Sequence, residues 1–235
     1  MVSRVLLGMA LLAVLACPAA VQGDVVVYSQ PCSTEYAIFS DLSRFTEGYF
    51  AADDFELADE CRITDVHWWG VYLVEPPPDD DFTIEFYEDV SGSPAMDPFE
   101  SFNVGPVTRQ YAEKDLVTQG GGVYKIYGYS CYLTTPVDLS GGTRYYLSVY
   151  NNTEINTDDD WVWMSAGTPT GTEEVWWRDS QTMAWALIST EPPYIPRELV
   201  AFKLTGTVIP EPVSSLLFVG SVGLGLLWRK RHRAA

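Results

Sequence analysis

Short stretches in which apolar and polar side chains alternate one by one set the strongest limit on how this chain can fold. In the clearest stretch, Phe82, Ile84 and Phe86 alternate with Thr83, Glu85 and Tyr87. A period of two is typical of a β-strand with one buried face, because successive side chains of a strand point to opposite sides. Strand-like stretches recur at residues 25–28, 52–57, 64–73, 123–133, 143–150, 161–164, 174–178, 184–188 and 199–208.

Turn-forming residues separate these stretches, and no apolar stripe of helical period lies between them. The turn signals are the prolines at 76–78, Ser91-Gly92, the glycines at 120–122, Gly141-Gly142 and Pro192-Pro193. Short strands without crossover helices pair antiparallel. We therefore expect an all-β domain at residues 24–208, an antiparallel β-sandwich of jelly-roll type. Residues 94–119 show the weakest pattern and are expected to form a long loop containing one strand.

Residues 1–23 have the pattern of a secretory signal peptide. Arg4 gives the positive start, residues 5–16 are apolar, and Val21-Gln22-Gly23 offers a cleavage edge before Asp24. Residues 14–17 also form a weak lipobox that ends at Cys17. Cleavage after Gly23 would remove Cys17 with the signal peptide. The alternative is that Cys17 is kept and lipidated.

The C-terminus has the pattern of a membrane anchor. Residues 213–228 carry no charge, and as a helix they would span about 24 Å, against about 30 Å for a bilayer core. The basic residues Arg229, Lys230, Arg231 and Arg233 follow at once. This order is typical of a stop-transfer segment with a cytoplasmic end. We expect a single transmembrane helix within residues 209–235; the alternative is a buried terminal element of the domain.

The three residues Pro210, Glu211 and Pro212 stand directly before this apolar run. Motif, apolar span and basic end together resemble the PEP-CTERM sorting signal of Gram-negative bacteria that make exopolysaccharide. The resemblance implies export, with residues 210–212 as the recognition motif of an exosortase-type processing enzyme and residues 229–233 as the retention end. The two prolines would keep the motif out of helix and strand.

The domain between the two terminal segments is also similar to a recurrent β-rich module of PEP-CTERM proteins. The resemblance rests on Ala52-Asp53-Asp54-Phe55, Trp68-Trp69-Gly70-Val71-Tyr72, residues 82–87, Asp160-Trp161-Val162-Trp163 and Ala201-Phe202-Lys203-Leu204. It implies an extracellular β-sandwich, and no activity comes with it.

The charge of the domain excludes nucleic acid as a partner. The chain has 32 Asp and Glu against 14 Lys and Arg. Arg4, the four basic tail residues and Glu211 lie outside residues 24–209, which leaves 31 acidic against 9 basic residues and a net charge of −22. Such a surface repels a phosphate backbone.

Three cysteines remain after removal of the signal peptide, which leaves at least one unpaired. We predict a disulfide between Cys32 and Cys61, which would close a modest loop near the start of the domain. Cys131 lies in an apolar, aromatic strand and is expected to be a buried free thiol.

Acidic clusters in loops make calcium a candidate cofactor, because calcium is bound by several carboxylate and carbonyl oxygens. The clusters are Asp53-Asp54, then Asp79, Asp80 and Asp81, then Asp158, Asp159 and Asp160. We assign the calcium site to the second and third clusters. None has the spacing of a known calcium loop, and the alternative is solvated loop charge.

The many aromatic residues make carbohydrate a candidate ligand. Eight Trp and fourteen Tyr occur, and Trp68-Trp69 and Trp176-Trp177 are adjacent pairs. In a strand one member of each pair faces the core and the other faces outward. We predict Trp69, Trp161 and Trp177 as an outward stacking platform; the alternative is that these rings pack in the core.

Catalytic patterns are weak. His67 is the one histidine of residues 24–209; it stands mid-strand and is expected to be structural. HExxH, GxxxxGK[ST] and GxGxxG are all absent from the sequence. We therefore expect a non-enzymatic, exported surface or extracellular-matrix protein associated with exopolysaccharide. The alternatives are a carbohydrate-binding module and a secreted glycoside-active enzyme, which needs two carboxylates across a cleft.

Overall fold

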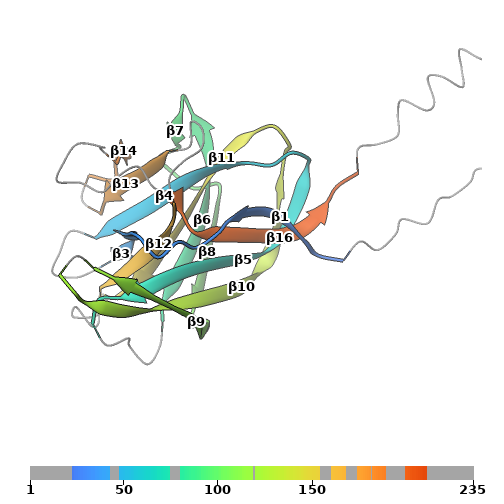
Figure 1. Cartoon of the computed structure of the whole chain (residues 1–235). Helices are drawn as coiled ribbons and strands as arrows, with labels where there is room; N and C mark the ends of the chain where they lie inside the picture. Colours follow the sequence, from blue (N-terminus) through green and yellow to red (C-terminus); the bar gives the residue numbers. More distant parts are fainter. Residues whose placement is uncertain are drawn as a thin grey trace, which may run out of the picture.

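The computed structural model describes residues 23–42, 48–74, 80–118, 120–153, 160–167, 174–180, 182–188 and 199–210. Every regular element in these ranges is a strand, so the all-β class is confirmed (Figure 1). The predicted signal peptide and terminal helix lie outside the described residues, apart from Gly23, Ile209 and Pro210. In the described ranges, no helix has the length and apolar character needed to cross a bilayer.

The first sheet has eight strands, most of them long and antiparallel. Its main order is β1 (Val25–Gln30), β16 (Phe202–Val208), β5 (Cys61–Tyr72), β10 (Val123–Leu139) and β9 (Thr108–Val117). Strand β12 (Trp161–Gly167) pairs with the far part of β5, and also with β2 (Ala37–Phe39) and β15 (Leu199–Val200). Strand β5 therefore has neighbours on both sides along most of its length.

The second sheet also has eight strands. Its order is β14 (Ala186–Leu187), β13 (Val175–Asp179), β4 (Tyr49–Glu56), β3 (Asp41–Leu42), β11 (Arg144–Asn152), β6 (Phe82–Val90) and β7 (Ser93–Pro94), with β8 (Glu100–Gly105) also beside β6. Strands β4 and β11 pair directly over five residues. The short contact of β3 with β11 is parallel, so the sheet is mixed.

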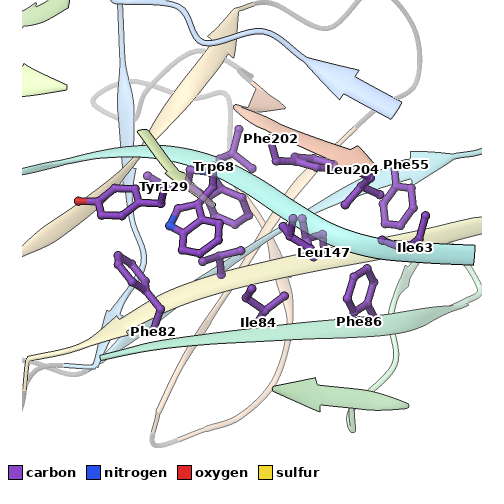
Figure 2. Packing of buried hydrophobic residues seen from close by; sticks show 14 of the residues in the cluster. Phe55, Ile63, Trp68, Phe82, Ile84, Phe86, Tyr129, Leu147, Phe202 and Leu204 are labelled. Atoms are coloured by element: carbon purple, nitrogen blue, oxygen red, sulfur yellow. The ribbon is translucent and has the colours of Figure 1, made fainter. Parts of the chain in front are cut away.

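The hydrophobic core lies between the two sheets (Figure 2). Trp68 on β5 and Phe202 on β16 face Ile84 on β6 and Leu147 on β11, and all four side chains are fully buried. Each such side chain contributes about 1.5–3 kcal/mol when it leaves water. The inward half of the predicted alternation is confirmed, because Phe82, Ile84 and Phe86 all belong to this core.

Residues 94–119 differ from the prediction of one strand in a long loop. They form the end of β7, all of β8 and the ten-residue strand β9. Strand β9 is an edge of the first sheet and is mostly exposed, with charged residues such as Glu113 and Lys114 along it. Its apolar alternation is weak because an edge strand buries little and is commonly protected by charge.

The predicted disulfide between Cys32 and Cys61 is wrong, because both thiols are free, as is Cys131. Cys61 belongs to the core between the sheets, whereas Cys32 packs against a second cluster around Val71 and Met164. Val71 and Trp68 point to opposite faces of β5, so the two thiols belong to clusters on opposite sides of the first sheet. Cys131 is half-buried rather than fully buried.

Gly70 on β5 allows a close approach of Trp161 on β12. A Cβ atom at Gly70 would lie 2.3 Å from Cζ2 of the buried indole of Trp161. We expect Gly70→Ala to lower the free energy of unfolding by about 3 kcal/mol, because the packed core cannot move the ring away. Chemical denaturation followed by tryptophan fluorescence measures the change. Gly120→Ala is the control, since nothing lies within 4 Å of its Cβ; equal stability of both variants contradicts the packing described.

Candidate functional site

The two acidic loops of the predicted calcium site begin and end beside each other. The Leu73 N–H, before the first loop, donates to the carbonyl of Asp160 at 3.0 Å. The Asn152 N–H, before the second loop, donates to the carbonyl of Asp81 at 2.9 Å. Each loop therefore starts where the other ends. Asp79, Asp158 and Asp159 lie outside the described residues.

Asp80 is held by protein groups at this end of the sandwich. Its carboxylate is buried; Oδ1 accepts a hydrogen bond from the Tyr72 hydroxyl and lies 3.3 Å from the Arg109 guanidinium. Arg109 also lies over the rings of Tyr72 and Tyr127, at 5.6 and 5.3 Å. Asn151 Nδ2 donates to the Tyr72 hydroxyl at 2.7 Å. A buried carboxylate with an arginine partner is costly to separate, so Asp80 anchors the end of its loop.

The neighbouring acidic residues Asp81 and Asp160 also make hydrogen bonds within the protein. Asn152 Nδ2 donates to Asp81 Oδ2 at 3.1 Å, and Asp160 is half-buried with its carbonyl bonded to Leu73. Within the ranges that the structure describes, no group of three or more His, Cys, Asp or Glu is placed to hold a metal ion. Calcium binding at the two loops stays a prediction.

Asp53 and Asp54 join strands of the sandwich. Asp53 Oδ2 accepts from the Val200 N–H at 2.7 Å, and Asp54 Oδ1 accepts from the Glu174 N–H at 2.7 Å. Arg144 Nε lies 3.4 Å from the second oxygen of Asp54. The two carboxylates point to opposite faces of β4 because they are consecutive in a strand. Their first role is therefore structural.

The predicted aromatic platform does not form. Trp161 is fully buried, with its ring 5.1 Å from that of Phe82 in the core, so its outward placement is wrong. Trp69 is half-buried on the opposite face of the first sheet. Trp177 is half-buried in the second sheet, with its ring 5.7 Å from that of Tyr49. The three indoles lie in three separate places.

A different set of aromatic and polar side chains gathers on the side of the second sheet that points away from the core, here called the outer face. Its members alternate with core residues on β4, β6, β11 and β13. They are Phe50, Ala52, Thr83, Glu85, Tyr87, Tyr146, Ser148, Tyr150, Trp176 and Arg178. Most are buried. Trp185 packs on Tyr87 and Arg178, and the carbonyls of Ala95 and Met96 bond Trp185 and Arg178.

Arg178 is the centre of the outer face. Its guanidinium carbon lies 4.6 Å from the ring centre of Trp185 and 5.3 Å from that of Phe50. Nη2 donates to the Tyr87 hydroxyl at 2.7 Å and lies 3.4 Å from Glu85 Oε2. The Tyr87 hydroxyl donates to the same carboxylate. Burial raises the pKa of Tyr87, with the Glu85 charge adding to the effect, so this hydroxyl stays protonated and able to donate.

The alternation along β6 predicted one buried face and one face turned to solvent, and the second part of this prediction is wrong. Glu85 and Tyr87 occupy the positions that a half-buried strand turns to solvent, yet both are buried. The one available signal was Arg178 itself, a rare basic residue beside a tryptophan pair in an acidic chain.

Burial favours the neutral forms of His67 and of the three described cysteines. His67 Nε2 lies 3.0 Å from Asp65 Oδ2, and the Thr205 hydroxyl donates to the same oxygen. Burial lowers the pKa of His67 in spite of the Asp65 charge. Burial also raises the pKa of all three described thiols, that of Cys32 to about 11. At neutral pH the thiols are protonated and the imidazole is mostly neutral.

Removal of Arg178 tests the outer face. Arg178→Met leaves the buried Glu85 carboxylate without its cation, so we expect the free energy of unfolding to fall by about 3–5 kcal/mol. The double variant Arg178→Met with Glu85→Gln should recover part of this loss in chemical denaturation. The control is Arg62→Met, which breaks a pair exposed at 52% and 50% and should cost far less. Equal losses from the two arginines contradict the burial described.

The His67 environment predicts a pH effect. The folded chain resists protonation of His67, while the unfolded chain takes up the proton below its ordinary pKa of 6.5. Stability from the neutral ring is therefore lost as the pH falls below that value. We expect the urea midpoint to drop between about pH 7.5 and about pH 5.5, and to drop less in His67→Gln. The carboxylates titrate in both proteins and cancel in the comparison; equal slopes contradict the prediction.

Comparison with known proteins gives a family. The model of a domain of unknown function, DUF7901, matches residues 27–205, which spans β2 to β15 and most of β1 and β16. No curated protein matches the chain. Because the match covers more than half of its length, the chain belongs to the DUF7901 domain family.

Proposed function

We propose that the chain is an exported, non-enzymatic protein that is sorted through its C-terminal segment. Its β-domain, with the jelly-roll form of a sandwich, then serves at the cell surface or in an extracellular matrix that contains exopolysaccharide. The processing partner is an enzyme of exosortase type acting near Pro210, Glu211 and Pro212. The proposal rests on the two terminal segments and on the way in which the fold places the ends of the domain.

The pairing of β1 with β16 is the observation that carries the proposal. Val25 at the start of the domain is the register partner of Gly206 near its end (Figure 1). Val208 lies opposite Cys61, and the Ile209 N–H donates to the carbonyl of Glu60 at 2.8 Å. The last described strand therefore ends before Pro210. Cleavage at residues 210–212 would remove the C-terminal segment and leave every described strand in place.

The described residues that flank the two acidic loops lie at the other end of β5 from this exit. Strand β5 starts beside Val208 and ends at Tyr72, next to the first loop. Its 12 residues span about 36–40 Å at about 3.3 Å per residue. A chain tethered through its C-terminus would thus present the two acidic loops away from the membrane. This polarity is what a surface protein with an outward contact region requires.

Fractionation of the native host tests the proposal. We expect the full chain in the membrane fraction and a shorter form outside the cell, with an intact mass that ends near residues 210–212. Replacing Pro210, Glu211 and Pro212 together by alanine should hold the chain in the membrane-bound form. Ser214→Ala, in the same segment, is the control and should be processed normally.

Two results would contradict the proposal. One is a chain found outside the cell that still carries residues 229–235. The other is a chain that occurs only as the full-length membrane form, with or without the alanine replacement.

A further inference from the structure

Strand β1 forms an open edge of the first sheet. It pairs with β16 on one side, and among the strands that the structure describes none pairs with its other side. An edge strand offers backbone N–H and C=O groups to a further strand. Residues 23–26, at the start of β1, are all exposed, so this is the part of the edge that a further strand can reach.

The other edge strands carry features that discourage such pairing. Strand β9, at the opposite edge of the first sheet, has four charged residues, and its Glu113 takes a left-handed backbone conformation with φ of 56°. Strand β8 carries Glu100. The edge strands β2, β7, β14 and β15 have only two or three residues each. Charge, irregular backbone and short length are common ways to protect a sheet edge.

Strand β1 lacks this protection. Its six residues include no charged residue and no proline. It has one bulge, between Val26 and Tyr28, but Val25 and Val26 keep consecutive partners on β16. The two valines therefore lie in a regular part of the strand, next to the open side.

Val25 and Val26 are also the exposed apolar side chains of this strand. Val25 is 41% exposed and Val26 is 55% exposed. Consecutive residues of a strand point to opposite faces of the sheet, and the partners of these two on β16 are the small residues Gly206 and Thr205. A further strand alongside β1 would cover one valine on each face and remove apolar surface from water.

Charge favours a second copy of this chain as that further strand. The chain carries a net charge of −18, so two copies repel each other over most of their surfaces. This repulsion is weakest where a strip without charge meets its own copy. A basic partner would instead be drawn to the acidic surface outside β1.

Two-fold symmetry makes the absence of charge in β1 decisive. When a strand pairs antiparallel with its own copy, one residue lies opposite itself, because the same patch serves on both chains. A charged residue at this position would face a like charge, which destabilises the pair. Valine at this position faces valine, and both side chains gain cover.

We propose that two copies of the chain join through β1 as an antiparallel pair, which makes one continuous sheet from the two first sheets. The two-fold axis passes near Val25 and Val26. Because the paired strands run in opposite directions, the two Val208 ends also point in opposite directions. This arrangement suits chains that have left the membrane. The pairing goes beyond the proposed sorting and does not depend on it.

The size of the contact sets the strength that we expect. Six residues of a strand span about 20 Å, which gives a smaller contact than the standard protein interface of about 1,600 Å². The dimer should therefore be weak and reversible. It should become populated only at high concentration, as on a crowded surface or in a matrix.

Sedimentation velocity of the full chain in detergent micelles, over a series of protein concentrations, tests the pairing. We expect the fraction of dimer to rise with concentration. Amide hydrogen exchange at the same concentrations locates the contact. Exchange within residues 24–30 should become slower as the concentration rises, whereas residues 108–117 on β9 should exchange at an unchanged rate.

Charge variants give the sharper test. The double variant Val25→Lys with Val26→Lys should weaken the dimer about tenfold or more, because one lysine then faces its own copy whichever valine lies on the axis. The double variant Val25→Glu with Val26→Glu should do the same. A mixture of the lysine and glutamate variants should associate more strongly than either variant alone, since opposite charges then meet.

The matched control is the double variant Val90→Lys with Val117→Lys, at valines that are 54% and 62% exposed away from β1. It adds the same charge and should dimerise as the unaltered chain does. The thermal midpoints of all variants should agree, because every substituted side chain is largely exposed; such agreement excludes unfolding as the cause of a lost dimer.

Three outcomes would overturn the pairing. The first is a chain that stays monomeric at the highest soluble concentration. The second is a dimer that the β1 lysine variant leaves unchanged, which would place the contact elsewhere, for example in the C-terminal segment. The third is a mixture of lysine and glutamate variants that associates no better than its components. The fractionation result is independent of all three, so the sorting proposal and this one can fail separately.

Discussion

The insertion of the last strand between β1 and β5 is the interaction on which the rest of the structure depends. Strand β16 supplies Phe202 and Leu204 to the core and fits tightly, since a Cβ at Gly206 would lie 2.0 Å from the Arg62 carbonyl oxygen. The first sheet is therefore incomplete until the chain has been made as far as residue 208. Such distant pairing makes folding slow, and it also gathers both ends of the domain at one place, from which a tether would hold it.

The sequence predicted the core face of the strands well and their other face poorly. Apolar residues at every second position of β6 and β11 do lie between the sheets. The same pattern says nothing about whether a second layer covers the opposite face. Glu85 and Tyr87 are polar, yet both are buried beside Arg178, and Trp185 packs on Tyr87. The type of a residue indicates whether its side chain favours water. Whether that side chain is buried depends here on segments about 90 residues away in the sequence.

The errors about Trp161 and Cys32 have one physical cause. Local alternation fixes which side of a strand a residue takes but leaves open which side is the core. Trp161 points inward because β12 continues the first sheet beyond β16 and meets Gly70 on β5. Cys32 packs on the outside of that sheet, away from Cys61. Pairings of this range are set by the whole fold, so neither placement follows from neighbours in sequence.

Some of the acidic side chains of the domain are buried. Asp41, Asp53 and Asp65 are buried and accept hydrogen bonds from backbone N–H groups, hydroxyls or His67. Among the described buried acids, Asp54, Asp80 and Glu85 each face an arginine within 3.4 Å. Three arginines, Arg109, Arg144 and Arg178, pair with these buried acids, and the exposed acids keep the surface negative. A polymer that carries acid groups would be repelled over most of this surface.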